Sequence, residues 1–302
     1  MKYTIIPAIL LAALTFAGPA GGSHASAQEK KFILPEIPSD LRTPDQRRKW
    51  LILNYWQHYD FTDTALVKSV ETEQAFSDFL SLFDEADEKT VCRGIRNMMD
   101  AASGDPAVYS GMLEIADIYL YHYDSPFRDD EKYIHFLRHA LKSRCLDSSR
   151  KILPAEQLDM ALKNRKGSRA ANFTMTTGSG KNIDLKDIKA EMTILFFFDP
   201  ECRDCEMTRI LLSTSPVIKE KTADGSLKIL AVYPEDINGK WISKTGKMPE
   251  CWIKAYDGSG KILENELYDL GAYPALYLLD RKHRVLLKET DVANIEFYLE
   301  NC

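Results

Sequence analysis

Three apolar runs of strand length in the second half of the chain do most to constrain its fold. The runs are residues 192–198, 227–233 and 275–279. Each is continuous rather than alternating, which is typical of a strand covered on both faces of a sheet. Helix-length segments separate the runs, and the third continues through the polar turn 280–283 into 285–288. We therefore predict a sheet that starts parallel, ends in an antiparallel hairpin, and is covered by a last helix over 292–299.

The first half of the chain has a helical period instead. Two sets of residues follow the spacing of a buried helix stripe: Phe76, Phe79, Leu80 and Phe83, then Val91, Ile95, Met98, Met99 and Ala102. Asp105 followed by Pro106 is typical of a helix N-cap and the first helical position. Further helices are predicted over 133–141 and 155–162. No internal repeat of fixed length occurs, so a solenoid is not supported.

The two halves meet near residue 166. Three glycines lie between residues 28 and 165 and nine follow residue 165, so turn-poor sequence gives way to turn-rich sequence. The stretch 166–169 has no apolar residue and is the predicted linker. We predict a separate all-α domain over residues 28–165, followed by an α/β domain over residues 166–302.

The N-terminal segment, residues 1–27, is organised like a secretory signal peptide. Lys2 supplies the positive end, and residues 5–17 form an apolar run too short to span a bilayer. Residues 25–27 are a small-residue cleavage site before Gln28. A retained membrane anchor is the alternative, but Gly, Pro and Ser follow the run where basic residues would be expected. The segment has no cysteine for lipid attachment, so we predict a periplasmic or otherwise exported product without a membrane span.

A pair of cysteines, Cys202 and Cys205, directly follows the first apolar run and precedes a helix-length segment. A helix beginning near Cys202 places its sulfur at unpaired backbone N–H groups and the positive end of the helix dipole, which favour thiolate over thiol. The distance between two Cα atoms three residues apart in a helical turn is close to the range of about 4.4–6.8 Å that a disulfide tolerates. We predict Cys202 as the nucleophile and Cys205 as the resolving thiol of dithiol-disulfide exchange. Neighbouring charges act in both directions: Arg203 favours the thiolate, while Glu201, Asp204 and Glu206 oppose it.

Three segments of the second half carry a resemblance to a known family. They are Ala171-Asn172-Phe173 with the turn at 178–180, the apolar strand into Cys202-Arg203-Asp204-Cys205, and residues 268–280. Together they resemble the thioredoxin-like family, most closely the envelope thiol-disulfide interchange proteins related to cytochrome c maturation reductases. The resemblance covers about residues 166–302. It implies a central mixed sheet flanked by helices and chemistry that needs no metal and no organic cofactor.

The resemblance also implies substrate-binding residues and partners. In such proteins the proline before the third strand is cis and packs beside the cysteine pair, and the preceding backbone pairs with an extended substrate strand. Pro274, preceded by Tyr273, is the matching position. Protein thiols and disulfides would then be the substrates, with reduction favoured over oxidation or isomerisation. A membrane electron donor would have to recharge the pair.

Two departures from the family pattern concern the residues around the cysteines. Many thioredoxins carry a buried acid six residues before the first cysteine, where it helps to deprotonate the resolving thiol, but this chain has Phe196. Glu201, which stands where Trp is common, or water would have to accept that proton. Arg203-Asp204 replaces the usual Gly-Pro between the cysteines. The reaction class is unaffected, but these residues do not fix its direction.

The first half resembles a helical domain that precedes thioredoxin-like domains in envelope proteins of the Bacteroidetes, partly through residues 55–61. No chemistry transfers with this resemblance. An aromatic cluster lies in and beside that segment: Trp50, Tyr55, Trp56, Tyr59 and Phe61. It could line a peptide groove, but ordinary core is the favoured interpretation because large aromatic side chains are usually buried for packing.

Other uses of the cysteines stay open. The CxxC motif can be half of a zinc site or a structural disulfide, although no second CxxC or close Cys-His pair accompanies it. Cys92 and Cys145 are either bridged or two buried free thiols. Cys251 and Cys302 could form a second redox pair, but nothing in their spacing requires it.

Among whole-protein functions, we favour an exported thiol:disulfide oxidoreductase acting as a disulfide reductase. An envelope docking protein on a thioredoxin-like scaffold is the alternative, and a thiol peroxidase is weaker because no Thr or Ser with Arg surrounds a lone cysteine. A net charge of −6 without a basic stripe disfavours nucleic-acid binding. His135 and His139 share a helix face, but Phe136 stands where a zincin carries Glu, so a solvated face is favoured over a metal site.

Overall fold

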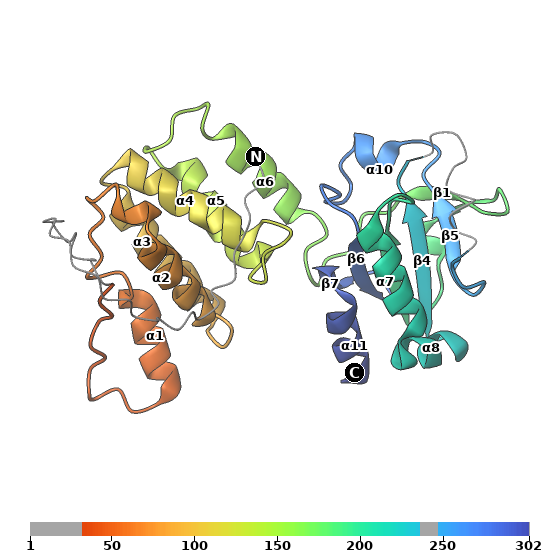
Figure 1. Ribbon diagram of the computed structural model, residues 1–302, viewed down its shortest axis with the longest axis horizontal. Coiled ribbons are helices and arrows are strands. Elements are labelled where there is room, and N and C mark those ends of the chain that lie inside the picture. The colour runs from red at the N-terminus through yellow and green to blue at the C-terminus, as the bar shows by residue number, and fades with distance from the viewer. Residues whose placement is uncertain (1–31, 236–246, 302) are drawn as a thin grey trace, which may run out of the picture. The chain divides into compact units, whose positions relative to one another are not determined.

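The computed structural model describes residues 32–235 and 247–301. The predicted signal sequence, residues 1–27, lies outside the described residues. Along the chain, a group of helices precedes a sheet flanked by helices, which confirms the predicted order of an all-α region and an α/β region (Figure 1). Within the two described ranges, no helix is both long and apolar enough to cross a membrane. Residues Phe32–Cys302 form one compact unit, so the domain boundary near residue 166 stays a prediction.

The helices of the first region begin at polar capping residues. In the described part of the chain they are α1 (Pro44–Asn54), α2 (Val70–Ser81), α3 (Glu88–Ala102), α4 (Pro106–Leu120), α5 (Asp130–Lys142) and α6 (Ile152–Leu162), with a short 3-10 turn η1 (Leu66–Lys68). Side chains of Thr43, Ser69, Asp87, Asp105 and Asp129 each accept a hydrogen bond from a backbone N–H in the first turn of their helix. The predicted start of a helix at Pro106 after its cap is confirmed, and α5 and α6 include the ranges predicted for them.

The aromatic cluster belongs to the core of this helical region. Tyr55, Trp56 and Tyr59 are 3%, 6% and 9% exposed and pack in one apolar cluster with Phe76 and Phe79 of α2. The favoured interpretation, ordinary core, is therefore confirmed for these three side chains. Their burial anchors the end of α1 and the following turn to the rest of the helices.

The cysteines outside the CxxC motif form no bridge among the described residues. Cys92 and Cys145 are both free, so the alternative of a disulfide between them is wrong. Cys145 Sγ donates to the carbonyl oxygen of Ser103, at the end of α3, whereas Cys92 lies near the start of that helix. About 16 Å of helix separates Cys92 from Ser103 at ~1.5 Å per residue. Cys251 is a free, exposed thiol, and Cys302 lies outside the described residues.

The two histidines of α5 make contacts with neighbouring side chains. His139 Nδ1 lies 2.8 Å from the hydroxyl of Tyr109 and its Nε2 lies 2.9 Å from Asp100 Oδ1. His135 Nε2 lies 3.9 Å from Glu88 Oε1. His139 therefore uses both ring nitrogens to join α5 to α3 and α4.

The sheet follows the predicted order of parallel and antiparallel pairs. Its described strands are β1 (Thr174–Thr177), β2 (Asn182–Asp184), β3 (Met192–Phe197), β4 (Leu227–Tyr233), β5 (Ile253–Tyr256), β6 (Ala275–Asp280) and β7 (Val285–Thr290), in the spatial order β2-β1-β5-β4-β3-β6-β7. β3 and β4 pair parallel, as do β4 and β5, whereas β6 runs antiparallel to both β3 and β7. The parallel start and the antiparallel hairpin at the end are confirmed, and β1, β2 and β5 add to the predicted strands.

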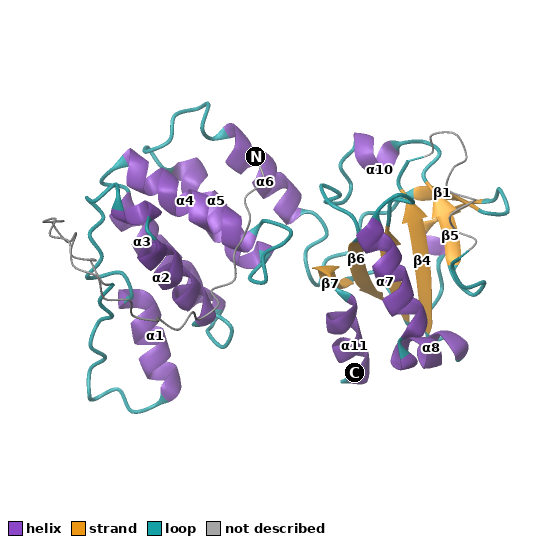
Figure 2. Ribbon diagram, in the orientation of Figure 1, coloured by secondary structure: helices purple, strands orange, loops and turns teal. Residues whose placement is uncertain are grey.

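The apolar runs are continuous because both faces of the sheet are covered. The helical elements here are α7 (Arg203–Thr214), α8 (Pro216–Ala223), α10 (Lys261–Glu264), α11 (Val292–Glu300) and the 3-10 turn η2 (Leu185–Asp187) (Figure 2). Ile194 and Phe196 of β3 belong to the core formed with α7, α8 and α11. Leu195 and Phe197 alternate with them and belong to the opposite core, which includes η2 and α10. The predicted last helix over 292–299 is confirmed as α11.

The predicted linker, residues 166–169, is hydrogen-bonded to the β6–β7 hairpin. The N–H of Gly167 donates to the carbonyl oxygen of Val285 at 2.7 Å, and the N–H of Val285 donates to the carbonyl oxygen of Ser168 at 2.9 Å. Arg169 continues the pairing as an isolated bridge opposite Arg284. The predicted linker is therefore polar, but its backbone is hydrogen-bonded to the sheet and does not form an unpaired loop.

A largely buried charge cluster, with side chains 8–19% exposed, joins the helical region to the sheet. It consists of Arg128, Asp130, Asp269, Lys288 and Glu289. Arg128 pairs with Asp269 and Glu289, and Lys288 pairs with Asp130. Two cations face three carboxylates, so a proton on one carboxylate balances the charge. Burial is the largest cause that raises the pKa of Glu289, to about 7.

This pKa predicts how stability changes with pH. Glu289 holds a proton in the folded protein up to about pH 7 but loses it near its usual pKa of 4.5 when unfolded. Its contribution to stability is therefore present below about pH 4.5 and is lost as the pH rises to about 7. We expect that loss to be on the order of 3 kcal/mol, from about 1.36 kcal/mol per pKa unit. Urea unfolding across this range measures it, and Glu289→Gln should remove that part of the slope. An unchanged slope in the variant would contradict the assignment.

Candidate active site

The cysteine pair lies at the junction of β3 and α7. β3 ends at Phe197 and α7 begins at Arg203, so Cys202 is the N-cap residue, with extended backbone (φ −77°, ψ 124°). Its Sγ accepts a hydrogen bond from the backbone N–H of Cys205 at 3.1 Å. A sulfur thus occupies the position in which Ser or Asp normally caps a helix. The sulfur of Cys202 therefore faces the first backbone N–H groups and the positive end of the dipole of α7.

The two sulfurs differ in access to solvent. Cys205 is 3% exposed and belongs to the core beneath α7, whereas Cys202 is half-buried. Burial, followed by the hydrogen bond to Cys202, raises the pKa of the Cys205 thiol well above its ordinary value. The more accessible sulfur, that of Cys202, therefore lies at the start of the helix, and the buried sulfur of Cys205 beneath it keeps its proton.

The predicted cis proline lies beside the cysteine pair. The peptide bond between Tyr273 and Pro274 is cis, as the family resemblance implied. The antiparallel register of β3 and β6 sets Phe197 opposite Ala275, which brings the residues before β6 next to those after β3. As a result the carbonyl oxygen of Tyr273 lies 3.5 Å from Cys202 Sγ.

An open pocket of about 370 Å³ adjoins the two sulfurs, and ion pairs form part of its wall. Arg209 donates to both carboxylate oxygens of Glu206, at 3.0 and 2.9 Å, and Lys247 lies 3.5 Å from the same carboxylate. The hydrogen bonds from Arg209 lower the pKa of Glu206 to about 2. Glu206 is thus ionised, but two cations compensate its charge. Its repulsion of negative charge at the cysteine pair is therefore weaker than the sequence alone suggests.

Asp199 is a site residue that the sequence prediction missed. Its Oδ1 accepts from the N–H of Glu201 at 2.6 Å and its carbonyl oxygen accepts from the N–H of Cys202 at 3.1 Å. Asp199 lines the same pocket as both sulfurs, and its charge is among the causes that raise the pKa of Cys205. Glu201 is exposed and is not among the charges that act on Cys205. The only sequence signal is the Asp-Pro pair just before the CxxC motif.

Phe196 occupies the place of the buried acid, as the sequence predicted. It is fully buried in the same core as Cys205. The side chain at this position of β3 therefore supplies no carboxylate to the covered sulfur. The chain's acidic groups approach it from the β3–α7 turn instead.

Comparison with known proteins agrees with this fold. A crystal structure of a thioredoxin-like protein from Bacteroides caccae superimposes with a TM-score of 0.86 and 36% identity, covering 90% of this chain and 99% of that chain. The thiol-disulfide oxidoreductase ResA of Bacillus cereus is 29% identical over 141 residues, which is 44% of this chain and 76% of the relative. ResA of Bacillus anthracis is 28% identical over 142 residues, with the same shares.

A thioredoxin-like α/β fold with a CxxC pair at the start of a helix defines a class of redox proteins. The chain belongs to the thioredoxin-like thiol-disulfide oxidoreductase family. Residues 15–164 match DUF5106, a domain of unknown function, so the helical region comes without an assigned role.

Proposed function

We propose that this protein is an exported thiol:disulfide oxidoreductase that reduces protein disulfides through Cys202 and Cys205. The observation that carries the proposal is the sulfur of Cys202 at the N-cap of α7, bonded by the N–H of Cys205. This sulfur is half-buried, faces the start of a helix where catalytic thiols are commonly found, and has the second thiol, Cys205, behind it. Two named relatives that match 44% of this chain are thiol-disulfide oxidoreductases, which supports the same chemistry.

The proposed reaction has two exchange steps. The Cys202 thiolate attacks one sulfur of a substrate disulfide, a mixed disulfide forms, and the other substrate sulfur leaves as a thiolate. Cys205 then loses its proton and attacks Cys202 Sγ, which releases the second substrate sulfur. The substrate gains two electrons, and the protein is left with a Cys202–Cys205 disulfide. An electron donor, which we place in the membrane, must reduce that disulfide before the next turnover.

The substrate is proposed to bind beside Tyr273 and Pro274. Cys202 Sγ donates to the carbonyl oxygen of Tyr273 at 3.5 Å, which sets the backbone before Pro274 beside the nucleophile. An extended peptide that pairs with this segment would carry its disulfide to Cys202. This arrangement suits protein substrates, because backbone pairing needs no particular side chain. Residues 1–27 are proposed to direct export before cleavage at Gln28, to a compartment such as the periplasm.

The direction of electron flow is tested by the reduction potential. A reductase should have a potential nearer to the about −270 mV of thioredoxin than to the about −120 mV of a strongly oxidising dithiol protein. Equilibration of the purified protein with glutathione buffers, followed by quantification of free Cys202 and Cys205 thiols, measures it. A potential close to the oxidising value would contradict the reductase assignment but leave dithiol-disulfide exchange intact.

The proton of Cys205 has two candidate acceptors, Glu201 and Asp199. We favour Asp199 because its charge acts on Cys205 and it lines the pocket with both sulfurs. Asp199→Asn keeps an oxygen acceptor for the N–H of Glu201 but removes the base. We expect it to slow closure of the mixed disulfide about ten-fold or more, whereas Glu201→Gln should leave the rate nearly unchanged. Single-turnover kinetics with a small disulfide resolves the two steps.

The reverse ranking of these variants would identify Glu201 as the acceptor. A faster closure step in Asp199→Asn would show that the carboxylate acts only as a repelling charge, because its removal lowers the pKa of Cys205. Either result would contradict the role that we assign to Asp199.

A further inference from the structure

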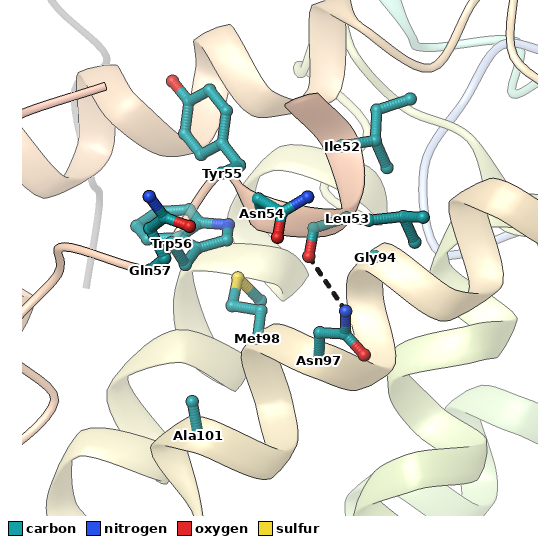
Figure 3. Close-up of a pocket in the computed structure, with 10 residues that line it drawn as sticks. All are labelled: Ile52, Leu53, Asn54, Tyr55, Trp56, Gln57, Gly94, Asn97, Met98 and Ala101. Atoms are coloured by element: carbon teal, nitrogen blue, oxygen red, sulfur yellow. Dashed lines mark hydrogen bonds between the residues drawn. The ribbon is translucent and has the colours of Figure 1, made fainter. Parts of the chain in front are cut away.

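A second pocket lies in the helical region, between the end of α1 and the middle of α3 (Figure 3). Its volume is about 130 Å³. Ile52, Trp56 and Met98 form a buried floor, whereas Asn97 and Ala101 of α3 lie at an exposed rim. The pocket is therefore open to a ligand from solvent, and it shares no lining residue with the pocket beside Cys202.

The floor of this pocket carries an unsatisfied donor. Trp56 is 6% exposed, and its indole Nε1 has no hydrogen-bond partner among residues 32–235 and 247–301. In Figure 3 this nitrogen lies on the edge of the indole ring that faces the middle of the group of lining residues. Burying an N–H without an acceptor costs free energy, and native proteins rarely leave one unpaired. The indole N–H thus lacks the acceptor that a ligand could supply.

An acceptor lines the same pocket as this donor. The Nδ2 of Asn54 donates to the carbonyl oxygen of Trp50 at 2.7 Å, which fixes the orientation of the carboxamide, since a carbonyl can pair only with the NH₂ group. Its Oδ1 is left without a hydrogen bond to the described residues, and Figure 3 shows this oxygen turned toward the space beside Trp56. One donor and one acceptor therefore face the same space.

Close packing of α1 on α3 holds the pocket in shape. A Cβ at Gly94 would lie 2.5 Å from Ile52 Cγ2 and 3.0 Å from its carbonyl oxygen, so only glycine allows this approach. Asn97 Nδ2 donates to the carbonyl oxygen of Leu53 at 2.9 Å (Figure 3). The polar groups of the pocket are thus largely fixed before a ligand arrives, which reduces the entropy lost on binding.

These features define the chemistry of the ligand. None of the residues that line the pocket carries a formal charge, so a neutral ligand is favoured over an ion. A cavity of ~150 Å³ accommodates benzene, so this pocket has room for a group of about five or six heavy atoms. We propose that it binds a primary carboxamide on a short aliphatic chain, whose carbonyl accepts from Trp56 Nε1–H and whose NH₂ donates to Asn54 Oδ1. The carboxamide belongs either to a free small molecule or to a Gln or Asn side chain of a protein. This site is independent of the chemistry at Cys202.

The indole resonances of the whole chain provide the test. The four tryptophans each contribute one Nε1–H signal in a ¹H–¹⁵N spectrum, and Trp56→Phe identifies the one from the pocket. Propionamide is expected to shift this signal saturably. Butanone, which lacks the donor, and propionate, which is charged, should bind at least about five-fold more weakly. Trp56→Phe should weaken binding about ten-fold, as loss of one hydrogen bond implies, with the shifts of neighbouring backbone amides as readout.

Two further variants keep the test decisive if Trp56→Phe disturbs folding. Ala101→Met fills the rim without touching the polar groups and should abolish binding, while Trp50→Phe, outside the pocket, should leave it unchanged. A capped peptide with a Gln side chain distinguishes the sources: binding of both probes supports a protein ligand, and binding of propionamide alone supports a small molecule. Absence of a saturable shift with either probe, equal binding of propionate or butanone, or full affinity in Ala101→Met would overturn the proposal.

Discussion

Replacing Cys202 with serine is expected to lower the rate of insulin reduction by about three orders of magnitude or more, to the rate without protein. A serine hydroxyl at the N-cap of α7 would still accept the hydrogen bond from the N–H of Cys205, so folding should be preserved. The hydroxyl is not ionised at neutral pH and forms no disulfide, so the first exchange step is lost. The matched control is Cys251→Ser, which removes an exposed free thiol and should leave the rate unchanged.

This variant also separates the proposed enzyme from its main alternative. If the protein were a docking platform on a thioredoxin-like scaffold, partner binding would survive in Cys202→Ser and the wild-type protein would show no turnover. Insulin reduction by the wild-type protein, together with its loss in Cys202→Ser but not in Cys251→Ser, supports the enzyme. An equal rate in all three proteins would show that a different group carries the activity.

Removing Lys288 is expected to have the largest effect on stability. Its ammonium group pairs with Asp130 and donates to the carbonyl oxygens of Ala161 and Lys163, at 3.3 and 3.0 Å. Lys288→Ala would leave these acceptors and the carboxylate of Asp130 buried without a cation, and Asp130 Oδ1 already lacks a partner among the described residues. We expect a loss of about 3–5 kcal/mol of unfolding free energy, or roughly 10 °C in Tm.

The control for this prediction is a lysine at the surface. Lys163 pairs with the exposed carboxylates of Asp159 and Glu266, and such ion pairs contribute ~0–1 kcal/mol. Lys163→Ala should therefore change Tm far less than Lys288→Ala, as measured by thermal unfolding at neutral pH. Similar losses in the two variants would contradict the view that the buried charge cluster holds the helical region to the sheet.

Apart from β7, which was predicted as the second strand of a hairpin, the strands that could be predicted are those buried on both faces. β3, β4 and β6 are continuous apolar runs because two cores cover them, and that pattern is visible in the sequence. β1, β2 and β5 are short and have exposed or half-buried polar residues, so no period identifies them. Their pairing depends on neighbours far along the chain, which local sequence does not encode.

Helix α1 was missed for a similar reason. Ile52 is the one buried residue of α1, and the sequence of this helix is mostly charged and polar. No periodic set of apolar residues therefore predicts a helix here. Its start is nevertheless encoded locally, because Thr43 and Gln46 form a capping box around Pro44 in the first turn. The sequence thus indicates this helix by its N-terminal capping residues and not by a periodic spacing of apolar residues.

The cysteine pair was predictable because its chemistry depends on spacing along the chain, whereas Asp199 and Trp56 were not. The importance of Asp199 depends on the turn that carries its charge to the covered sulfur of Cys205. Whether the N–H of Trp56 finds a partner depends on which acceptors the folded chain brings near it, and none of the described residues supplies one. The aromatic character of Trp56 predicted burial correctly, but burial alone does not show whether the donor is satisfied.

The most direct test of the proposed mechanism is to identify the sulfur that captures a substrate. In Cys205→Ser the first exchange step should proceed and the second should not, so the mixed disulfide accumulates. Incubation of the reduced variant with a peptide disulfide, followed by alkylation and mass spectrometry, locates the link. We predict that the peptide is attached at Cys202, and that it is released when wild-type Cys205 is present. Attachment at Cys92, Cys145 or Cys251 instead, with Cys202 alkylated, would contradict the account.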